Sequence, residues 1–305
     1  MAFMATVVVG VDFSEHSRRA LQVALGLAER QKARLIAVNV IDLLLVEAAA
    51  VAYDDDRLST ETETALRLFV SAECRDRFAS VAREVEIRVG QADRELLAAV
   101  TEHHADVIVV GTHGLGGVRK LFFGSTAEKV LRHSRVPVLA VPWDGSRPAA
   151  TEFTAAIAAI ELDETAASLT AAAVRVAGAL NLPLSLLHVV RPLQIGWRWA
   201  EARDAALPAR ARHARKALEA VAASAGAAAP SVIVSIGEPE EQIASATVQQ
   251  PGSLLIVGLG EGELWRRPGS TAYRILCLSA APVLAVPVAA VAAKPPATDV
   301  TAVTA

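Results

Sequence analysis

An internal repeat is the feature of this 305-residue chain that most limits how it can fold. Four strand-like segments of the first half recur in the second half, in the same order and 145 to 149 positions later. The clearest pair is VPVLAVP at Val136–Pro142 and APVLAVP at Ala281–Pro287. DVIVVG at Asp106–Gly111 likewise matches SLLIVG at Ser253–Gly258. The chain is therefore a tandem duplication of one structural unit.

Each copy alternates short β-branched runs with longer helix-forming stretches. Runs such as Val107–Val110 are apolar throughout, which is typical of a parallel sheet covered on both faces. The alternation predicts right-handed βαβ units in an α/β fold with two open, doubly wound sheets, each of five parallel strands. In the first copy we expect strands near 6–12, 34–41, 84–89, 106–111 and 136–141, and helices near 14–31, 58–80, 92–103 and 125–134.

A polar segment with glycine and proline, Trp143–Thr151, separates the two copies and is the expected linker. We therefore predict a first domain at 1–143 and a second at 152–288. Residues 289–305 are rich in alanine and threonine without an amphipathic pattern, and we expect them to form a flexible tail.

Composition excludes several classes of protein. A formal net charge of −3 gives no attraction to nucleic acid or to an anionic membrane surface. Apolar runs stop well short of the roughly 20 residues that span a membrane, and the N-terminus lacks the basic segment of a signal peptide. Cys74 and Cys277 lie in different halves and suggest neither a disulfide nor a metal site. We expect a cytoplasmic protein.

A glycine-rich segment follows the fourth predicted strand with the spacing G-x2-G-x9-G-[ST], formed by Gly111, Gly114, Gly124 and Ser125. Glycines allow positive φ and a close backbone approach to an anion, and the helix that starts near Ser125 offers free N–H groups at its positive end. Neither the P-loop nor the dinucleotide-binding pattern is present. Ser125 and Glu128 also have the spacing of a capping box for that helix.

This glycine motif resembles the ATP-binding pattern of the universal stress protein family. The opening VVVGVDFSEHSRRALQVALGLA is similar to the first strand and helix of that family, and VPVLAVP is similar to its last strand. The resemblance covers residues 3–142 and, more faintly, 153–287. It implies a Rossmann-like fold of the adenine nucleotide alpha hydrolase type. It also implies an ATP-binding regulator of the stress response rather than an enzyme, with little or no hydrolysis.

The resemblance assigns roles to individual residues. Gly10 and Asp12 are similar to family positions that contact the nucleoside, although Asp12 could instead cap the following helix. Val40 resembles the position whose backbone binds the adenine edge. A Mg²⁺ ion would be held mainly by phosphate oxygens and water. The residues implied around the phosphates are Gly111, Thr112, His113, Gly114, Gly116, Gly117, Arg119, Gly124, Ser125 and Thr126.

Two of these loop residues also have simpler interpretations. His113 has no visible catalytic partner and reads as an exposed loop residue. Arg119, with its neighbour Lys120, either approaches the triphosphate or is a solvated charge. His188 replaces Asn39 of the first copy within a strand, and we expect it to serve packing at the strand end.

The second copy departs from the motif. Asp12 corresponds to Glu161, and Gly114 corresponds to Glu261, whose carboxylate would repel a phosphate. The segment from Gly258 to Gly269 is also two residues shorter than its counterpart. We predict that the second domain binds ATP weakly or not at all. The resemblance also implies that the two last strands pair edge to edge within the chain, which would hide two exposed strand edges; a homodimer of whole chains is left open.

Two alternatives from other classes remain. One is an adenine-nucleotide-using enzyme of the same superfamily, which would need catalytic cations beyond Arg119 and Lys120. The other is a scaffold that binds no nucleotide in either copy, against which the complete set of Gly111, Gly114 and Gly124 argues.

Overall fold

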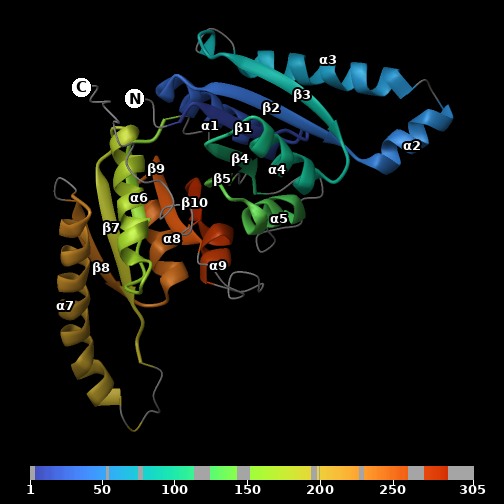
Figure 1. The fold of residues 1–305 in the computed structure, drawn as a ribbon. Coiled ribbons are helices and arrows are strands. Elements are labelled where there is room, and N and C mark those ends of the chain that lie inside the picture. The colour runs from blue at the N-terminus through green and yellow to red at the C-terminus, as the bar shows by residue number, and fades with distance from the viewer. Residues whose placement is uncertain are drawn as a thin grey trace, which may run out of the picture.

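The computed structural model describes residues 4–52, 55–74, 78–112, 124–142, 152–193, 198, 200–226, 230–259 and 271–287. Figure 1 shows how its helices and strands are arranged. The first half contains β1 (Thr6–Gly10), α1 (Glu15–Gln31), β2 (Arg34–Ile41), α2 (Leu43–Ala52), α3 (Asp55–Glu73), β3 (Arg83–Val89), α4 (Ala92–Glu102), β4 (Val107–Gly111), α5 (Ser125–His133) and β5 (Val138–Val141). The second half contains β6 (Ala155–Ala159), α6 (Ala166–Ala179), β7 (Leu184–Val190), α7 (Ala200–Ser224), β8 (Ser231–Ile236), α8 (Pro239–Gln249), β9 (Ser253–Leu259), α9 (Thr271–Leu278) and β10 (Val283–Pro287).

The strands of both halves form one ten-stranded sheet in the order β3-β2-β1-β4-β5-β10-β9-β6-β7-β8. Pairing within each half is parallel throughout. The second half repeats the strand order of the first, with β6 in the place of β1 and β9 in the place of β4. These features confirm the predicted α/β fold with a doubly wound parallel sheet in each half.

The two halves meet where β5 pairs with β10 in antiparallel orientation, and Leu139 lies opposite Leu284 in that register. This is the edge-to-edge pairing of last strands that the family resemblance implied. Side chains at the end of α1 add a second connection. Gln31 Nε2 donates to the carbonyl of Ala179 at 2.8 Å, and Arg30 Nη1 donates to that of Phe153 at 3.2 Å. The first half therefore supplies donors to backbone carbonyls of the second, including one at the end of α6.

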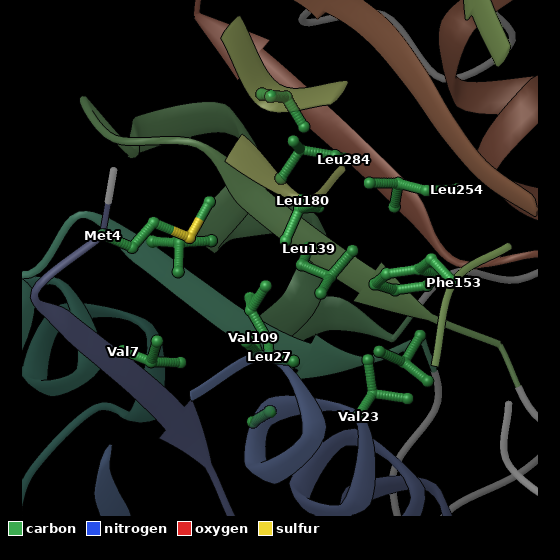
Figure 2. Packing of buried hydrophobic residues seen from close by; sticks show 14 of the residues in the cluster. Met4, Val7, Val23, Leu27, Val109, Leu139, Phe153, Leu180, Leu254 and Leu284 are labelled. Atoms are coloured by element: carbon green, nitrogen blue, oxygen red, sulfur yellow. The ribbon is translucent and has the colours of Figure 1, made fainter. Parts of the chain in front are cut away.

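Buried apolar side chains form a layer on each face of the sheet. The larger cluster lies on the side of α1, α3, α6 and α7 and includes residues of both halves. Figure 2 shows part of it, with Leu139 of the first half and Phe153 and Leu284 of the second. The other cluster lies on the side of α4, α5, α8 and α9. The halves thus share a core as well as a sheet.

Most predicted elements of the first half are confirmed to within a few residues, but α2 has no counterpart among them. Its sequence, LLLVEAAAVA, has almost no polar residues and so lacks the 3.6-residue periodicity that marks an amphipathic helix. Leu43, Leu44 and Leu45 are 53%, 73% and 55% exposed, so burial gives no periodic signal there either. In the part of the chain that the structure describes, no helix is both long and apolar enough to cross a membrane.

Candidate functional site

The predicted site residues that the structure describes lie at the carboxyl ends of β1, β2 and β4 and at the start of α5. Strands β1 and β4 are neighbours, but the helices that follow them cover opposite faces of the sheet. Helix α1 packs in the larger cluster and α5 in the other. The strand order therefore changes direction between β1 and β4, and in open α/β sheets this is where the ligand crevice forms.

Asp12 shapes the turn from β1 into α1. Its Oδ1 atom accepts hydrogen bonds from the backbone N–H of Ser14 at 3.0 Å and from the Ser14 hydroxyl at 2.5 Å. The N-cap of α1 is Ser14, whose side chain accepts from Ser17 N at 3.1 Å. Asp12 thus supports the cap through one oxygen only. Its side chain is exposed, and among the described residues Oδ2 accepts no hydrogen bond. The alternative that Asp12 is itself the helix cap is therefore wrong, because Ser14 is the N-cap and Asp12 only supports it.

Phe13, between Asp12 and Ser14, adopts a φ of 63°, a conformation that bulky residues rarely take. Its ring packs edge-to-face against Phe69 of α3, with ring centroids 5.5 Å apart. The Arg18 guanidinium lies 4.5 Å from the centre of the Phe69 ring and pairs with Glu73 at 2.5 Å. The hydrogen bond to Glu73 raises the pKa of Arg18. These contacts hold the turn that presents Asp12.

Val40 directs its backbone groups past the end of β1. The carbonyl of Val38 accepts from Val11 N at 2.9 Å, and backbone groups two residues apart in a strand point the same way. Between them, the buried side chain of Asn39 donates from Nδ2 to the carbonyl of Val11 at 2.8 Å. Asn39 is not among the residues that were predicted for the site. A polar residue inside an otherwise apolar strand is the sequence feature that could have identified Asn39.

Two predicted glycines have structural reasons of their own. A Cβ on Gly10 would lie 3.1 Å from Leu96 Cδ1 of α4. A Cβ on Gly111 would lie 2.8 Å from the backbone oxygen of His16, so α1 can pack against the end of β4 only if residue 111 is glycine. The described glycines with positive φ are Gly90, Gly226, Gly237 and Gly252, and Gly111 is not one of them. Close packing of α1, rather than positive φ, explains this glycine.

The start of α5 corrects the predicted capping box. The N-cap is Gly124, no side chain caps it, and Ser125 is already the first helical residue. Glu128 pairs with Arg132 at 2.6 Å instead of reaching back to the N-terminus. The N–H of Gly124 donates to the carbonyl of Thr112 at 2.6 Å, which ties the helix start to the end of β4. The Ser125 and Thr126 hydroxyls make no hydrogen bond among the described residues, so both are available to a ligand.

Part of the predicted site lies outside the described residues, namely His113, Gly114, Gly116, Gly117 and Arg119, together with Lys120. Among the predicted residues that are described, Gly10, Asp12, Val40, Gly111, Thr112, Gly124, Ser125 and Thr126 come from the ends of three strands and one helix. The described residues hold no group of three or more His, Cys, Asp or Glu side chains suited to a metal ion.

The second half has the same strand-end contacts as the first, but different side chains at the corresponding site positions. His188 Nδ1 bonds the carbonyl of Ile160 at 2.8 Å, as Asn39 bonds Val11 in the first half, so its role is a strand-end contact. Asp42, at the end of β2, corresponds to Arg191, whose Nη2 donates to the Thr271 hydroxyl at 2.9 Å. The first residue of α9 is thus already engaged by a cation of the protein itself.

We predict that Gly111→Ala lowers the free energy of unfolding by about 1–3 kcal/mol, because the new Cβ would overlap the backbone of His16. Gly178→Ala in α6 is the matched control. No atom lies within 4 Å of a Cβ there, so the helix should gain about 0.5–1 kcal/mol. Urea denaturation of the two variants measures both changes. An unchanged midpoint for Gly111→Ala would show that α1 does not pack on β4 this closely.

Comparison with known proteins identifies the fold and the family. The crystal structure of a universal stress protein from Archaeoglobus fulgidus superposes with a TM-score of 0.65 at 18% identity, covering 92% of this chain and 98% of that one. A Pseudomonas aeruginosa protein described as functionally unknown superposes with a TM-score of 0.64 at 15% identity, covering 95% of each chain. At these identities the structures support the fold alone.

Two sequence relatives each match less than half of this chain. A universal stress protein from Thermus aquaticus is 31% identical over 137 residues, which is 45% of this chain and 97% of the relative. Universal stress protein Rv2005c of Mycobacterium tuberculosis is 32% identical over 136 residues, which is 44% of either chain. The model of the universal stress protein family matches residues 4–142 and again 153–287. The chain therefore belongs to the universal stress protein family, with two tandem copies of the family's domain.

Proposed function

We propose that this protein is an ATP-binding regulator of the stress response that holds the nucleotide in its first half and hydrolyses it little or not at all. One observation carries the proposal. Helix α5 starts on Gly124 without a side-chain cap, so its first N–H groups and the Ser125 and Thr126 hydroxyls are left for a ligand beside the end of β4. Unsatisfied donors at the positive end of a helix form a site for phosphate.

The remaining described residues suit the other parts of the nucleotide. The free Oδ2 of Asp12 is an acceptor for ribose hydroxyls, and the backbone of Val40 offers a donor and an acceptor for the adenine edge. Mg²⁺ would be held by phosphate oxygens and water, since the described residues offer no cluster of metal ligands. Membership of the family supports the regulatory role.

Two measurements test nucleotide binding. Adenine nucleotide is expected in acid extracts of the purified protein, and ATP·Mg²⁺ at about 100 times its Kd should stabilise the fold by about 2.7 kcal/mol. The absence of both would rule the proposal out.

Asp12→Asn should weaken ATP binding about tenfold, because an amide replaces the charged acceptor near the ribose. The asparagine keeps an oxygen that can accept from Ser14, so the turn into α1 should be preserved. Glu161→Gln makes the matched change in the second half and should leave the affinity unchanged. Titration calorimetry compares the affinities of the two variants for ATP. If Glu161→Gln alone lowered the affinity, the nucleotide site would be assigned to the second half.

A further inference from the structure

The two edges of the sheet, β3 and β8, are related by the duplication but differ in chemistry. On β3, Arg88 pairs with Glu86 at 2.6 Å and with Glu95 at 3.5 Å, and it also bonds Glu102 of α4. His103 reaches Glu86 at 2.7 Å. The positions 147 residues later carry no charge: they are Ile233, Ser235, Gln242, Gln249 and Gln250.

Charged side chains protect edge strands from pairing with other chains, and an uncharged β-branched edge invites such pairing. Strand β8 reads SVIVSI, and Ile233 and Ile236 are 38% and 44% exposed. The edge strand of the first half therefore carries charged residues of its own, and that of the second half carries none.

Hydrogen bonding shows which groups of β8 point outward. Gly237 N donates to the carbonyl of Val190 in β7, so alternation turns the backbone groups of Val232, Val234 and Ile236 away from β7. Arg215 Nη1 of α7 donates to the carbonyl of Val232 at 3.1 Å, as expected for a group without a strand partner. Among the described residues, the outward backbone groups of Val234 and Ile236 have no hydrogen-bond partner.

Helix α7 lines this edge with positive charge. Between Pro208 and Leu218 it carries Arg210, Arg212, Arg215 and Lys216, and no acidic residue. Arg210 Nη1 donates to the carbonyl of Arg191 after β7, whereas Arg215 bonds β8. Arg212 and Arg215 are three residues apart, so they share a face of the helix. Arg215 reaches the edge itself, while Glu219, one turn further on, is the first acidic residue after this run.

We propose that the β8 edge binds an extended segment of another protein, acidic on the side that faces α7 and β-branched on the side of Ile233. The segment would add as an eleventh strand through the outward groups of β8. An acidic side chain would pair with Arg215 and draw it off the Val232 carbonyl, which then accepts from the incoming strand. This binding is independent of the proposed nucleotide function.

Charge decides against a second copy of this chain as the occupant. Two β8 strands of two identical chains could pair in antiparallel orientation around Ile233 with two-fold symmetry. Such pairing would bring the basic faces of two α7 helices together, and like charges oppose it. An acidic peptide meets the same face with opposite charge.

Fluorescent peptides and the full-length chain test the proposal. A peptide of alternating glutamate and valine should bind at least about tenfold more tightly than one of alternating lysine and valine, and salt at about 0.5 M should reduce the difference. The double variant Arg212→Gln/Arg215→Gln should weaken the acidic peptide about fivefold or more, whereas the basic peptide should bind no more weakly than to the parent, because two like charges have been removed. Equal affinity for both peptides would overturn the proposal.

A second pair of variants tests the backbone pairing. Val234→Pro removes an outward N–H and no bond to β7, so β8 should persist while the acidic peptide binds at least about tenfold more weakly. Ile87→Pro makes the equivalent change in β3 and should not affect binding. If Val234→Pro fails to fold, the peptide affinities of the Arg212→Gln/Arg215→Gln variant decide whether the proposal holds. Sedimentation of the chain without peptide tests whether a second copy occupies the β8 edge instead. A dimer that dissociates in the Val234→Pro variant would overturn the proposal in favour of a second copy.

Discussion

The variant Ser125→Asp is expected to fold as stably as the parent and to bind ATP·Mg²⁺ roughly 10- to 1,000-fold more weakly. Ser125 is exposed at the first position of α5, where a carboxylate favours the helix dipole by about 0.3–1 kcal/mol. The same carboxylate would repel a phosphate by about 1–4 kcal/mol, according to how well water screens the pair. Thermal unfolding and titration calorimetry together separate these two effects.

Thr271→Asp provides the matched control at the start of α9. It places a carboxylate at the corresponding helix end of the second half, within reach of Arg191. If the nucleotide lies in the first half, this variant keeps the affinity of the parent. Loss of binding with Thr271→Asp and not with Ser125→Asp would assign the nucleotide to the second half. If both variants bound ATP as tightly as the parent, the phosphates would lie at neither helix start.

The fold was largely predictable because each signal for it is carried by many residues. Strands such as β4 are apolar runs, and every such run occurs twice, so an error in one copy can be checked against the other. Helix α2 escaped prediction because its leucines are exposed and its alanines follow no period. Helix α2 contacts α3 more than it contacts the sheet. Its residues therefore do not show the spacing of buried apolar residues that marks a helix packed on a core.

The site was less predictable, because its details depend on contacts between distant segments. The sequence suggested that Gly111 serves an anion, yet its neighbour is the backbone of His16, almost a hundred residues earlier. The spacing of Ser125 and Glu128 fits a capping box, but the helix starts one residue too early for Ser125 to be its cap. The case against a nucleotide site in the second half therefore depends on Glu161, Glu261 and Arg191, and not on how the helix is capped.

The variant Leu284→Asp is expected to destabilise the whole chain by about 4 kcal/mol or more, a large share of the 5–15 kcal/mol that holds a typical protein folded. Leu284 is 2% exposed and lies opposite Leu139, which is 1% exposed, in the β5–β10 pair. A carboxylate there would have to be buried without a partner or be protonated. Val248→Asp on α8, where the side chain is 54% exposed, should change stability by only about 0.5 kcal/mol.

The way in which Leu284→Asp unfolds tests how the two halves depend on each other. The larger core cluster contains residues of both halves, and Arg30 and Gln31 bond the second half from the first. We therefore expect hydrogen exchange in increasing urea to show the amides of β1 and those of β9 losing protection in one transition with a common midpoint. Two separate transitions, with the first half unaffected by the substitution, would show that the halves fold independently. In that case the second half could not support the nucleotide site through the shared sheet.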